Sequence, residues 1–447
     1  MTDSLPSIEV QKFIEHFKSI YLKPYRINFE HDGRARQFDL ALRHSSVAIL
    51  LYHTEKKQFL IVRQFRPAIF VSSIIKLPEN QGKDINDIDW NSYDREIGCT
   101  QELCAGIIDK DLPFLEIARE EIEEECGYSV RTSDIAHIAS YIVGMDESGS
   151  PQHLYYAQID ESKKISDGGG NVHEGEFIIK VWMTEDEARA KLNSFDGSSP
   201  PGFLYALQWW FNRQKHDIPF THQEEFVNWP LDPSVFPKGK MDRISDLKFT
   251  PDPPTNRFHP MRMLYKINGI EKSWDLAPCE NSTGVVLYDR KRDEIILNQR
   301  FRPAAFIGRT RNQPENKGKD LTTLDWSQYP IEWAYTLELC SGHLKTRDET
   351  RTACAVRNVA AKGGYRIGEE RLIRIGKAIM GISQGGDDIE VFFAEVTDED
   401  AITDFKPFED VIPIRLTREA AASVLQAKQS PGSPAIHFAV RWFLNYS

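Results

Sequence analysis

The sequence predicts an α/β (α+β) sandwich, in which helices flank a mixed sheet, and it predicts this unit twice in tandem. The chain has 447 residues, more than the roughly 100–200 residues that one hydrophobic core usually serves. A long segment recurs downstream at a constant spacing. Each copy contains short apolar runs rich in β-branched residues, together with two helical patterns. Length, repeat and apolar pattern therefore agree on two domains of one kind.

The internal repeat is a match without gaps between residues 24–106 and a segment 236 residues further along the chain. RQFRPA at Arg63 returns as QRFRPA at Gln299, and ELCAG at Glu102 returns as ELCSG at Glu338. This period is far above the about 20 to 50 residues of a solenoid unit. It therefore indicates the duplication of a whole domain.

The two copies lead us to expect one domain at 1–215 and a second at 251–447, with a Pro- and Asp-rich linker at 216–250. A helix is expected from Leu115 to Glu125, because the stretch is acidic and free of glycine, and Gly127 is placed to end it. A second helix is expected at GFLYALQWWFNRQ. Strands are expected at the β-branched runs SVAILLYH, QFLIVRQF, HLYYAQI, EFIIKVW, TGVVLYD and EIILNQRF.

The composition argues against several classes of partner. The formal net charge is -12 and the chain has no basic block, so a nucleic acid is not expected to be the main partner. No apolar run approaches the ~20 residues that cross a membrane, and the first residues lack the apolar core of a signal peptide. The six cysteines are scattered without a C-x-x-C pair, which favours reduced thiols. We therefore expect a cytoplasmic protein with no membrane or nucleic-acid partner.

Acidic residues gather at the end of the first predicted helix. Glu121, Glu124 and Glu125 follow an i, i+3, i+4 spacing, which should place all three carboxylates on one face. Such carboxylates repel unless a cation lies among them, and hard oxygen ligands suit Mg²⁺ or Mn²⁺. The alternative for the spacing by itself is a solvated acidic face.

The surrounding residues resemble the Nudix box, G-x5-E-x7-R-E-U-x-E-E-x-G-U, where U is aliphatic or aromatic. Gly106 opens the box, and the section from Glu121 to Tyr128 fills its end in register. Leu112 replaces the expected first glutamate, and Glu120 replaces the expected arginine. The flanking motifs RQFDL, VRQFRPA, ELCAG and GGGNVHEGEF are similar to those of the ADP-ribose and UDP-sugar pyrophosphatases, most closely the latter. The resemblance implies a Nudix-like sandwich.

The same resemblance implies a metal site in the first copy. Its ligands would be the carboxylates of Glu121, Glu124 and Glu125 and the carbonyl of Ala105, just before the box glycine. They would hold Mg²⁺, with Mn²⁺ as the alternative.

Substrate contacts and a catalytic base are implied as well. Arg66 of QFRPA would contact the diphosphate, and Glu102 of ELCAG would lie beside the metal. The base that activates water would come from the loop HEGEF, as Glu174 or Glu176, with Glu176 slightly preferred. The alternative for this loop is a flexible hairpin tip with incidental acids.

The second copy departs from the box where the ligands are expected. Asn358, Ala361 and Lys362 replace the three glutamates, and a lysine repels a divalent cation. The base loop is replaced by DFKPFEDVIPI. The second copy keeps three other family residues, Arg302, Glu338 and Arg357. We therefore expect 1–215 to be catalytic and 251–447 to be a degenerate, inactive copy.

An intramolecular pseudo-dimer would explain why the second copy persists. The related enzymes are homodimers in which an aromatic residue of one subunit stacks on the base bound by the other. The matching residues are Phe38 and Trp274. The hypothesis is that Trp274 of the second copy stacks on a nucleobase held by the first. The alternative is that Trp274 is a core residue.

The expected function is metal-dependent hydrolysis of a nucleoside diphosphate sugar, with UDP-glucose cleaved to UMP and glucose 1-phosphate as the favoured reaction. ADP-ribose or an ADP-sugar is the alternative substrate, because aromatic stacking is largely indifferent to base identity. A third possibility, from a different class, is a nucleotide-sugar binding protein without catalysis. Metal-dependent turnover would distinguish the enzyme from the binding protein.

Overall fold

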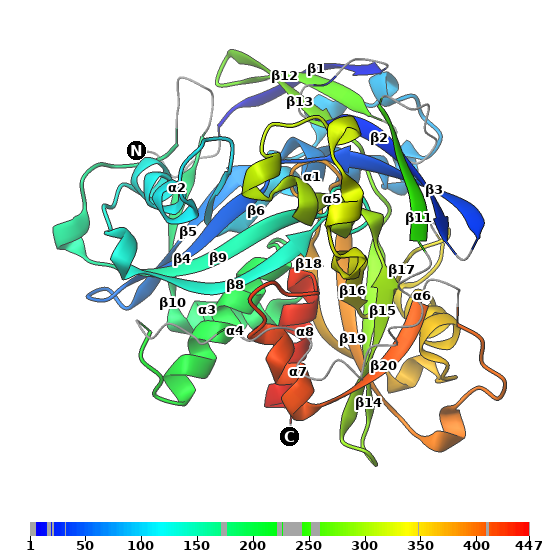
Figure 1. The fold of residues 1–447 in the computed structure, drawn as a ribbon. Coiled ribbons are helices and arrows are strands. Elements are labelled where there is room, and N and C mark those ends of the chain that lie inside the picture. The colour runs from blue at the N-terminus through cyan, green and yellow to red at the C-terminus, as the bar shows by residue number, and fades with distance from the viewer. Residues whose placement is uncertain are drawn as a thin grey trace.

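The computed structural model describes residues 6–15, 19, 22–31, 33–170, 177–220, 226, 244–251, 260–346, 348–407 and 411–446. These residues form two seven-stranded mixed sheets, one from each repeat, and two three-stranded sheets (Figure 1). Eight α-helices accompany them in the described part of the chain: α1 (Pro67–Ile75), α2 (Phe114–Glu121), α3 (Glu185–Ser194), α4 (Pro201–Lys215), α5 (Pro303–Arg311), α6 (Arg351–Asn358), α7 (Arg418–Leu425) and α8 (Pro434–Asn445).

The first seven-stranded sheet has the strand order β10-β5-β4-β9-β8, with β6 paired to β5 and β7 to β4. Its strands are β4 (Ser46–His53), β5 (Gln58–Phe65), β6 (Cys99–Glu102), β7 (Cys104–Ile107), β8 (Ile135–Val143), β9 (Ser150–Ile159) and β10 (Ile179–Thr184). β4 and β9 run parallel, and the other neighbours are antiparallel. The sheet is therefore mixed, as the sequence predicted.

The second sheet repeats this topology with the order β16-β15-β14-β19-β18, with β17 paired to β14 and β20 to β15. Its strands are β14 (Ser282–Asp289), β15 (Glu294–Phe301), β16 (Tyr335–Glu338), β17 (Cys340–His343), β18 (Ile373–Ile379), β19 (Asp388–Val396) and β20 (Val411–Thr417). β14 and β19 form the equivalent parallel pair. Two tandem copies of one fold are thereby confirmed.

Each central strand is buried on both faces. Ile49 and Leu51 of β4 pack in the core under α2, while Ala48 and Leu50 pack in a core that includes α4. Successive side chains of a strand alternate between faces, so a strand between two layers must be apolar throughout. This explains why SVAILLYH shows no polar alternation.

The two repeats share one of these cores. α4 and α8 pack against each other between the sheets, and a single apolar cluster contains residues of both repeats (Figure 1). Tyr205 of α4 and Tyr141 of β8 both contact the ring of His437 on α8. No helix among the described residues is long and apolar enough to cross a membrane.

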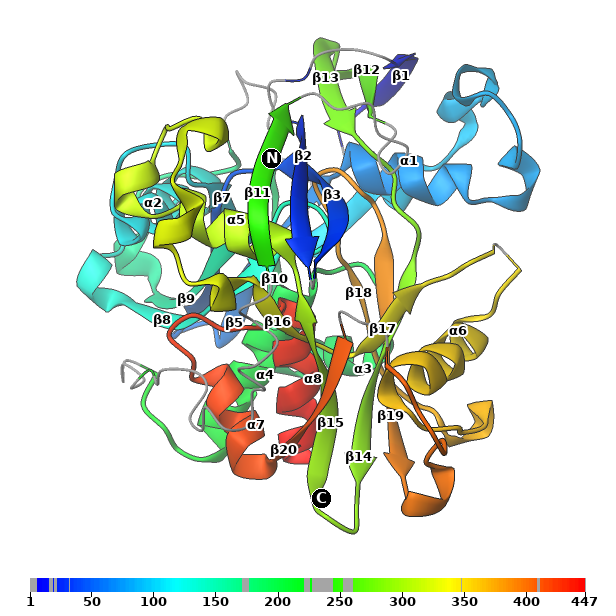
Figure 2. The ribbon, with the colours of Figure 1, turned by 45° about the vertical axis from the view of Figure 1, so that its right-hand side comes forward.

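The three-stranded sheets exchange strands between the repeats (Figure 2). In one, β1 (Ile8–Glu15) pairs with β12 (Met261–Ile267), which pairs with β13 (Ile270–Leu276). In the other, β11 (Ile244–Pro251) pairs with β2 (Lys23–His31), which pairs with β3 (Arg34–Leu42). Each hairpin of one repeat therefore takes its third strand from the other repeat.

The hairpins also cover the helix of the opposite repeat. Met263 and Leu276, from the β12–β13 hairpin, are fully buried in one cluster with Phe70 of α1. Ile27 of β2, in turn, is fully buried in a cluster with Phe306 of α5. Neither repeat therefore completes its own core.

The predicted linker, 216–250, ends inside a strand, because β11 occupies Ile244–Pro251. β11 lies 236 residues after β1, so the structural repeat begins well before residue 24, where the sequence match begins. Residues 221–225 and 227–243 lie outside the described part of the chain. The boundary at residue 250 therefore cuts through an element that belongs to a sheet of the fold.

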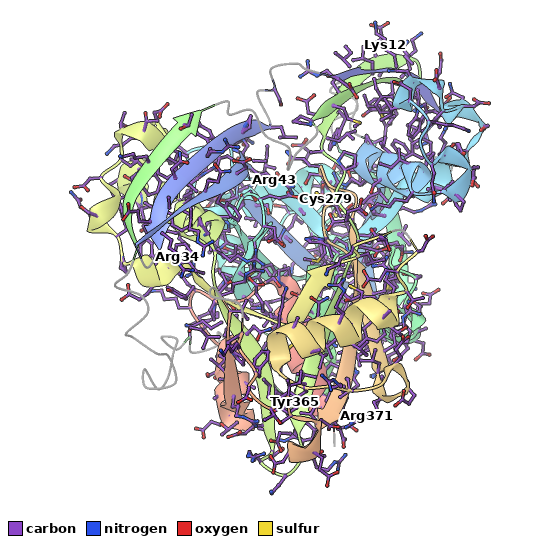
Figure 3. The ribbon with its side chains drawn as sticks, turned by 90° about the vertical axis from the view of Figure 1, so that its right-hand side faces the viewer. Lys12, Arg34, Arg43, Cys279, Tyr365 and Arg371 are labelled. Carbon is purple, nitrogen blue, oxygen red and sulfur yellow. The ribbon has the colours of Figure 1, made fainter. Side chains whose placement is uncertain are left out.

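The region between the two three-stranded sheets follows the same internal symmetry. Arg43 and its equivalent Cys279 both lie there (Figure 3). Arg43 forms an ion pair with Glu147, and Cys279 Sγ donates to Oε1 of the same carboxylate at 2.9 Å. The loop between β8 and β9 therefore reaches the second repeat.

We expect a chain cut between residues 230 and 231 to remain one particle, because the exchanged strands and the shared core hold the repeats together. A protease site inserted there, followed by size-exclusion chromatography, provides the measurement. Both fragments should elute together in buffer and separate in about 6–8 M urea, where buried apolar surface is exposed. Fragments that elute separately in buffer would contradict the exchange.

Candidate active site

Arg66 and Glu102 form a rigid pair at the start of α1. Arg66 precedes the helix, and its backbone N–H donates to Gly98 O at 2.8 Å. Its Nε and Nη2 donate to the two carboxylate oxygens of Glu102, both at 2.7 Å. Thr100 Oγ1 donates to the same carboxylate at 2.5 Å. Glu102 is 2% exposed, so the pair is fixed by packing and by a two-pronged hydrogen bond.

The predicted helix of the box has two parts. α2 ends at Glu121, and a π-helical turn, η5 (Ile122–Cys126), continues it. Gly127 ends the turn with φ 81°, as predicted. A Cβ on Gly127 would lie 2.4 Å from the carbonyl of Ser166, so the following loop packs directly on this turn. π-helical turns are rare and often occur at functional sites.

The structure places two of the three predicted glutamates against neighbouring residues of β7. Glu121 lies against β7, where a Cβ on Gly106 would come within 1.8 Å of its Oε1. Glu125 is 2% exposed and accepts a hydrogen bond from the Ala105 N–H at 3.0 Å, whereas Glu124 is exposed. In the described chain, no three acidic, histidine or cysteine side chains lie close enough together to hold a metal.

Glu125 is buried, and no cationic side chain in the described part of the chain pairs with it. Burial raises its pKa well above the ordinary value, and the nearby Cys126 and Glu121 raise it further, against the hydrogen bond from Ala105. Desolvation disfavours the charged form of a carboxyl group. Burial therefore disfavours the ionised form of this carboxyl group, and a nearby cation would offset that effect.

The glycine-rich segment after the box is anchored to the π turn. Gly169 N–H donates to Glu125 O at 2.8 Å, and Ile178 N–H donates to Gly169 O at 3.1 Å. The predicted bases, Glu174 and Glu176, lie outside the described residues. Both described ends of their segment thus attach beside Glu125.

The box helix of the first repeat lacks the glutamate–arginine pair of the box and has other ion pairs instead. Arg119 donates to Glu116 and Glu123, both at 2.9 Å. Leu112, which replaces the first box glutamate, is an exposed apolar side chain. Arg119 therefore makes intrahelical pairs next to the box position that has lost its arginine.

The second repeat keeps the pair that the first has lost. Glu349 and Arg357 stand eight residues apart, at the first glutamate and the arginine of the box. Arg357 donates to both oxygens of Glu349, at 2.7 and 2.9 Å. Arg302 likewise donates to both oxygens of Glu338, at 2.5 and 2.7 Å. The sequence comparison identified Arg302, Glu338 and Arg357 but missed Glu349, because one inserted residue shifts it.

The second repeat has groups with other contacts at the positions of the predicted metal ligands. Asn358 packs against Gly342 as Glu121 does against Gly106, but its Nδ2 donates to Cys354 O at 2.8 Å. Lys362, in place of Glu125, donates to the carbonyl of Ser341.

The two predicted stacking residues lie at different sites. Trp274 is partly buried against the cluster around α1, and its Nε1 donates to Ser383 O at 2.6 Å. Phe38 packs against the second repeat. Burial raises the pKa of Tyr265, on β12, to about 12 against the opposing charge of Arg66. The β12–β13 hairpin therefore approaches Arg66, whereas Phe38 is not brought to this site.

Sequence reasoning missed four further residues of these sites. Thr100 holds Glu102, and its counterpart Thr336 holds Glu338, so a threonine two residues before the glutamate in both repeats was an available signal. Tyr265 of the second repeat lies near the charge of Arg66 in the first, and Asp146 of the first repeat forms an ion pair with Arg302 in the second. A motif within one repeat does not indicate contacts that come from the other repeat.

Several proteins of known name are similar in sequence to this chain. No protein-family model matches the chain. The uridine diphosphate glucose pyrophosphatase of Mus musculus is 30% identical over 204 residues, which cover 44% of this chain and 90% of that protein. The protein of the same name from Bos taurus is 32% identical over 199 residues, covering 43% and 90%. A GDP-mannose pyrophosphatase of Cronobacter sakazakii is 32% identical over 144 residues, covering 32% and 62%.

The duplicated sandwich and the box at the end of α2 define an enzyme of the Nudix hydrolase class. With relatives that match over nine-tenths of their length, the chain belongs to the Nudix pyrophosphatases.

We expect Glu125→Gln to stabilise the metal-free protein at neutral pH by about 1–3 kcal/mol, the usual penalty for an uncompensated buried polar group. The folded-state pKa of Glu125 is raised, so its contribution to stability is complete below the ordinary value of 4.5. That contribution is lost as the pH rises through the folded-state pKa. Melting temperatures in EDTA between about pH 5 and 8 would measure this effect.

The exposed neighbour provides the control for this measurement. Glu124→Gln should change the pH dependence of melting much less, because Glu124 is exposed to solvent. If the melting temperatures of the wild type and Glu125→Gln depended equally on pH, the buried charge of Glu125 would not be destabilising.

Proposed function

We propose that the first repeat hydrolyses the diphosphate bond of nucleoside diphosphate sugars, with residues 1–215 as the catalytic domain and 251–447 as the inactive one. UDP-glucose is the proposed substrate, and UMP and glucose 1-phosphate are the products. The observation that carries the proposal is the buried Glu125 carboxylate beside Ala105, three residues after the Arg66-bound Glu102. The second repeat has Lys362 at the same position.

Oxygen donors of the first repeat are proposed to hold a divalent metal ion, with Mg²⁺ proposed and Mn²⁺ as the alternative. Glu121, Glu124, Glu125 and the carbonyl of Ala105 provide only oxygen donors, which hard cations prefer. A cation would also offset the burial penalty on the charge of Glu125. When bound, such an ion supplies positive charge that polarises the phosphoryl oxygens and makes water a better nucleophile.

Arg66 is proposed to bind and orient the diphosphate. Its guanidinium plane is fixed by the two-pronged contact with Glu102, so little side-chain entropy is lost when an anion binds. Positioning of this kind matters because diphosphate cleavage requires an in-line approach of water.

Glu176, or alternatively Glu174, is proposed as the base that accepts the proton of the attacking water. The anchoring of Gly169 on the carbonyl of Glu125 supports this role, because it places the described residues before these glutamates beside the box. Bond formation between water oxygen and phosphorus then accompanies cleavage of the phosphorus–oxygen bond of the anhydride.

Substrate preference rests on the relatives. The two UDP-glucose pyrophosphatases match over 90% of their length, and the GDP-mannose pyrophosphatase over 62% of its length. UDP-glucose is therefore favoured, with ADP-ribose and other nucleotide sugars as alternatives.

Release of UMP from UDP-glucose by the purified protein should require Mg²⁺, and Glu125→Gln should lower kcat by about 100-fold or more, since even partners outside the ligand shell cost 10–100-fold. Glu123→Gln is the matched control, because Glu123 lies in the same π turn but contacts Arg119 and Ser129. GDP-mannose and ADP-ribose assayed in parallel would identify the preferred base. Without turnover of any of the three, a binding protein would replace the enzyme.

Trp274→Ala should raise KM for UDP-glucose roughly tenfold with little change in kcat, because stacking on a base contributes about 1–3 kcal/mol to binding. Phe38→Ala is the control, since Phe38 packs against the other repeat. An unchanged KM for Trp274→Ala would assign Trp274 to the core instead.

A further inference from the structure

The box region of the second repeat carries a different charge from that of the first. Glu121, Glu124 and Glu125 are replaced by Asn358, Ala361 and Lys362, and Gln64 is replaced by Arg300. These exchanges remove three negative charges and add two positive ones. The first repeat needs a cation to attract a polyanion, whereas the second has cationic side chains of its own.

Lys362 lies where the family resemblance places a metal ion in the first repeat. Its ammonium group donates to the carbonyl of Ser341, which is the equivalent of Ala105. Burial lowers the pKa of Lys362, Arg300 lowers it further, and Glu338 opposes them. The ammonium group therefore contacts the second-repeat equivalent of the carbonyl that is proposed as a metal ligand in the first repeat.

Two arginines lie close to this lysine. Arg302 forms its two-pronged contact with Glu338, and Arg300 Nη1 lies 4.0 Å from Oε2 of the same carboxylate. Asp146, from the β8–β9 loop of the first repeat, forms an ion pair with Arg302. Within the described part of the chain, Lys362, Arg300 and Arg302 thus lie near the carboxylates of Glu338 and Asp146.

β15 adds a buried amide on the same side of the sheet. Asn298 stands two residues before Arg300 and replaces Val62 of the first repeat. It is 2% exposed, and its Oδ1 accepts no hydrogen bond from the residues that the structure describes. Its Nδ2 contacts Cys340, a thiol whose pKa also responds to the charge of Lys362. A polar group has therefore replaced an apolar one beside the lysine.

We propose that the second repeat binds the diphosphate of a nucleoside diphosphate or nucleotide sugar through Arg300, Arg302 and Lys362, without a metal and without hydrolysis. The class of ligand rests on the function proposed for the first repeat. Guanidinium and ammonium groups donate to phosphate oxygens directly, so the metal that carboxylates require becomes unnecessary.

Asp146 sets the strength of this site. Its carboxylate occupies a guanidinium nitrogen of Arg302 that a phosphate oxygen would use, so the ligand must compete with it. Asp146 belongs to the loop between β8 and β9 of the first repeat. A ligand that displaces its carboxylate from Arg302 would therefore couple binding in the second repeat to the first.

Isothermal titration with UDP in EDTA tests the site, because the first repeat lacks its cation under these conditions. Wild type should bind UDP in EDTA, and Arg300→Gln, which introduces the residue of the first repeat, should weaken binding by about tenfold or more. Asp146→Asn should strengthen binding by several-fold, a gain that misfolding cannot produce. Arg290→Gln, at an exposed arginine paired with Glu395, should change nothing.

Two comparisons assign the result to the second repeat. Arg63→Gln, at an arginine of the first repeat that pairs with Glu96, should leave binding in EDTA unchanged, whereas Lys362→Glu should abolish it. Absence of UDP binding in EDTA, or an affinity unaffected by both Arg300→Gln and Asp146→Asn, would overturn the proposal. Failure of the proposed function would instead appear as absent Mg²⁺-dependent hydrolysis, which this titration does not measure.

Discussion

The exchange of hairpins between the two repeats is the constraint on which the rest of the structure depends. The apolar side of α1 is covered by β12 and β13, and that of α5 by β2 and β3. Burial of such surface is the main favourable term in folding, so each repeat depends on the other for part of its stability. The same exchange brings Tyr265 toward Arg66, and the β8–β9 loop brings Asp146 to Arg302. Core and sites are thus built from both halves at once.

The two copies have diverged in complementary ways at the box. The first keeps the carboxylates Glu121, Glu124 and Glu125 and has lost the glutamate–arginine pair, which Arg119 replaces with neighbouring contacts. The second keeps the pair as Glu349 and Arg357 but has lost the carboxylates. Both retain the π turn and its terminal glycine. The fold of the box therefore depends on neither set alone.

Much of the fold could be predicted from local sequence, because strands such as β4 and β5 are continuous apolar runs and Gly127 marks a helix end. The repeat itself predicted the two sheets. The π turn was missed, since an i, i+3, i+4 spacing assumes α-helical geometry, and Glu125 turned inward instead. Strand exchange, Tyr265 and Asp146 were missed because they depend on residues more than a hundred positions apart.

Covalent fusion of the two halves has a genetic consequence. In an assembly of two identical chains, each substitution appears at both sites, so selection must tolerate it twice. In the fused chain the hairpins carry Phe38 and Trp274, and the box positions carry Glu125 and Lys362, independently of each other. One site can therefore lose its original role and evolve another. The shared core keeps the two repeats together in one folded protein.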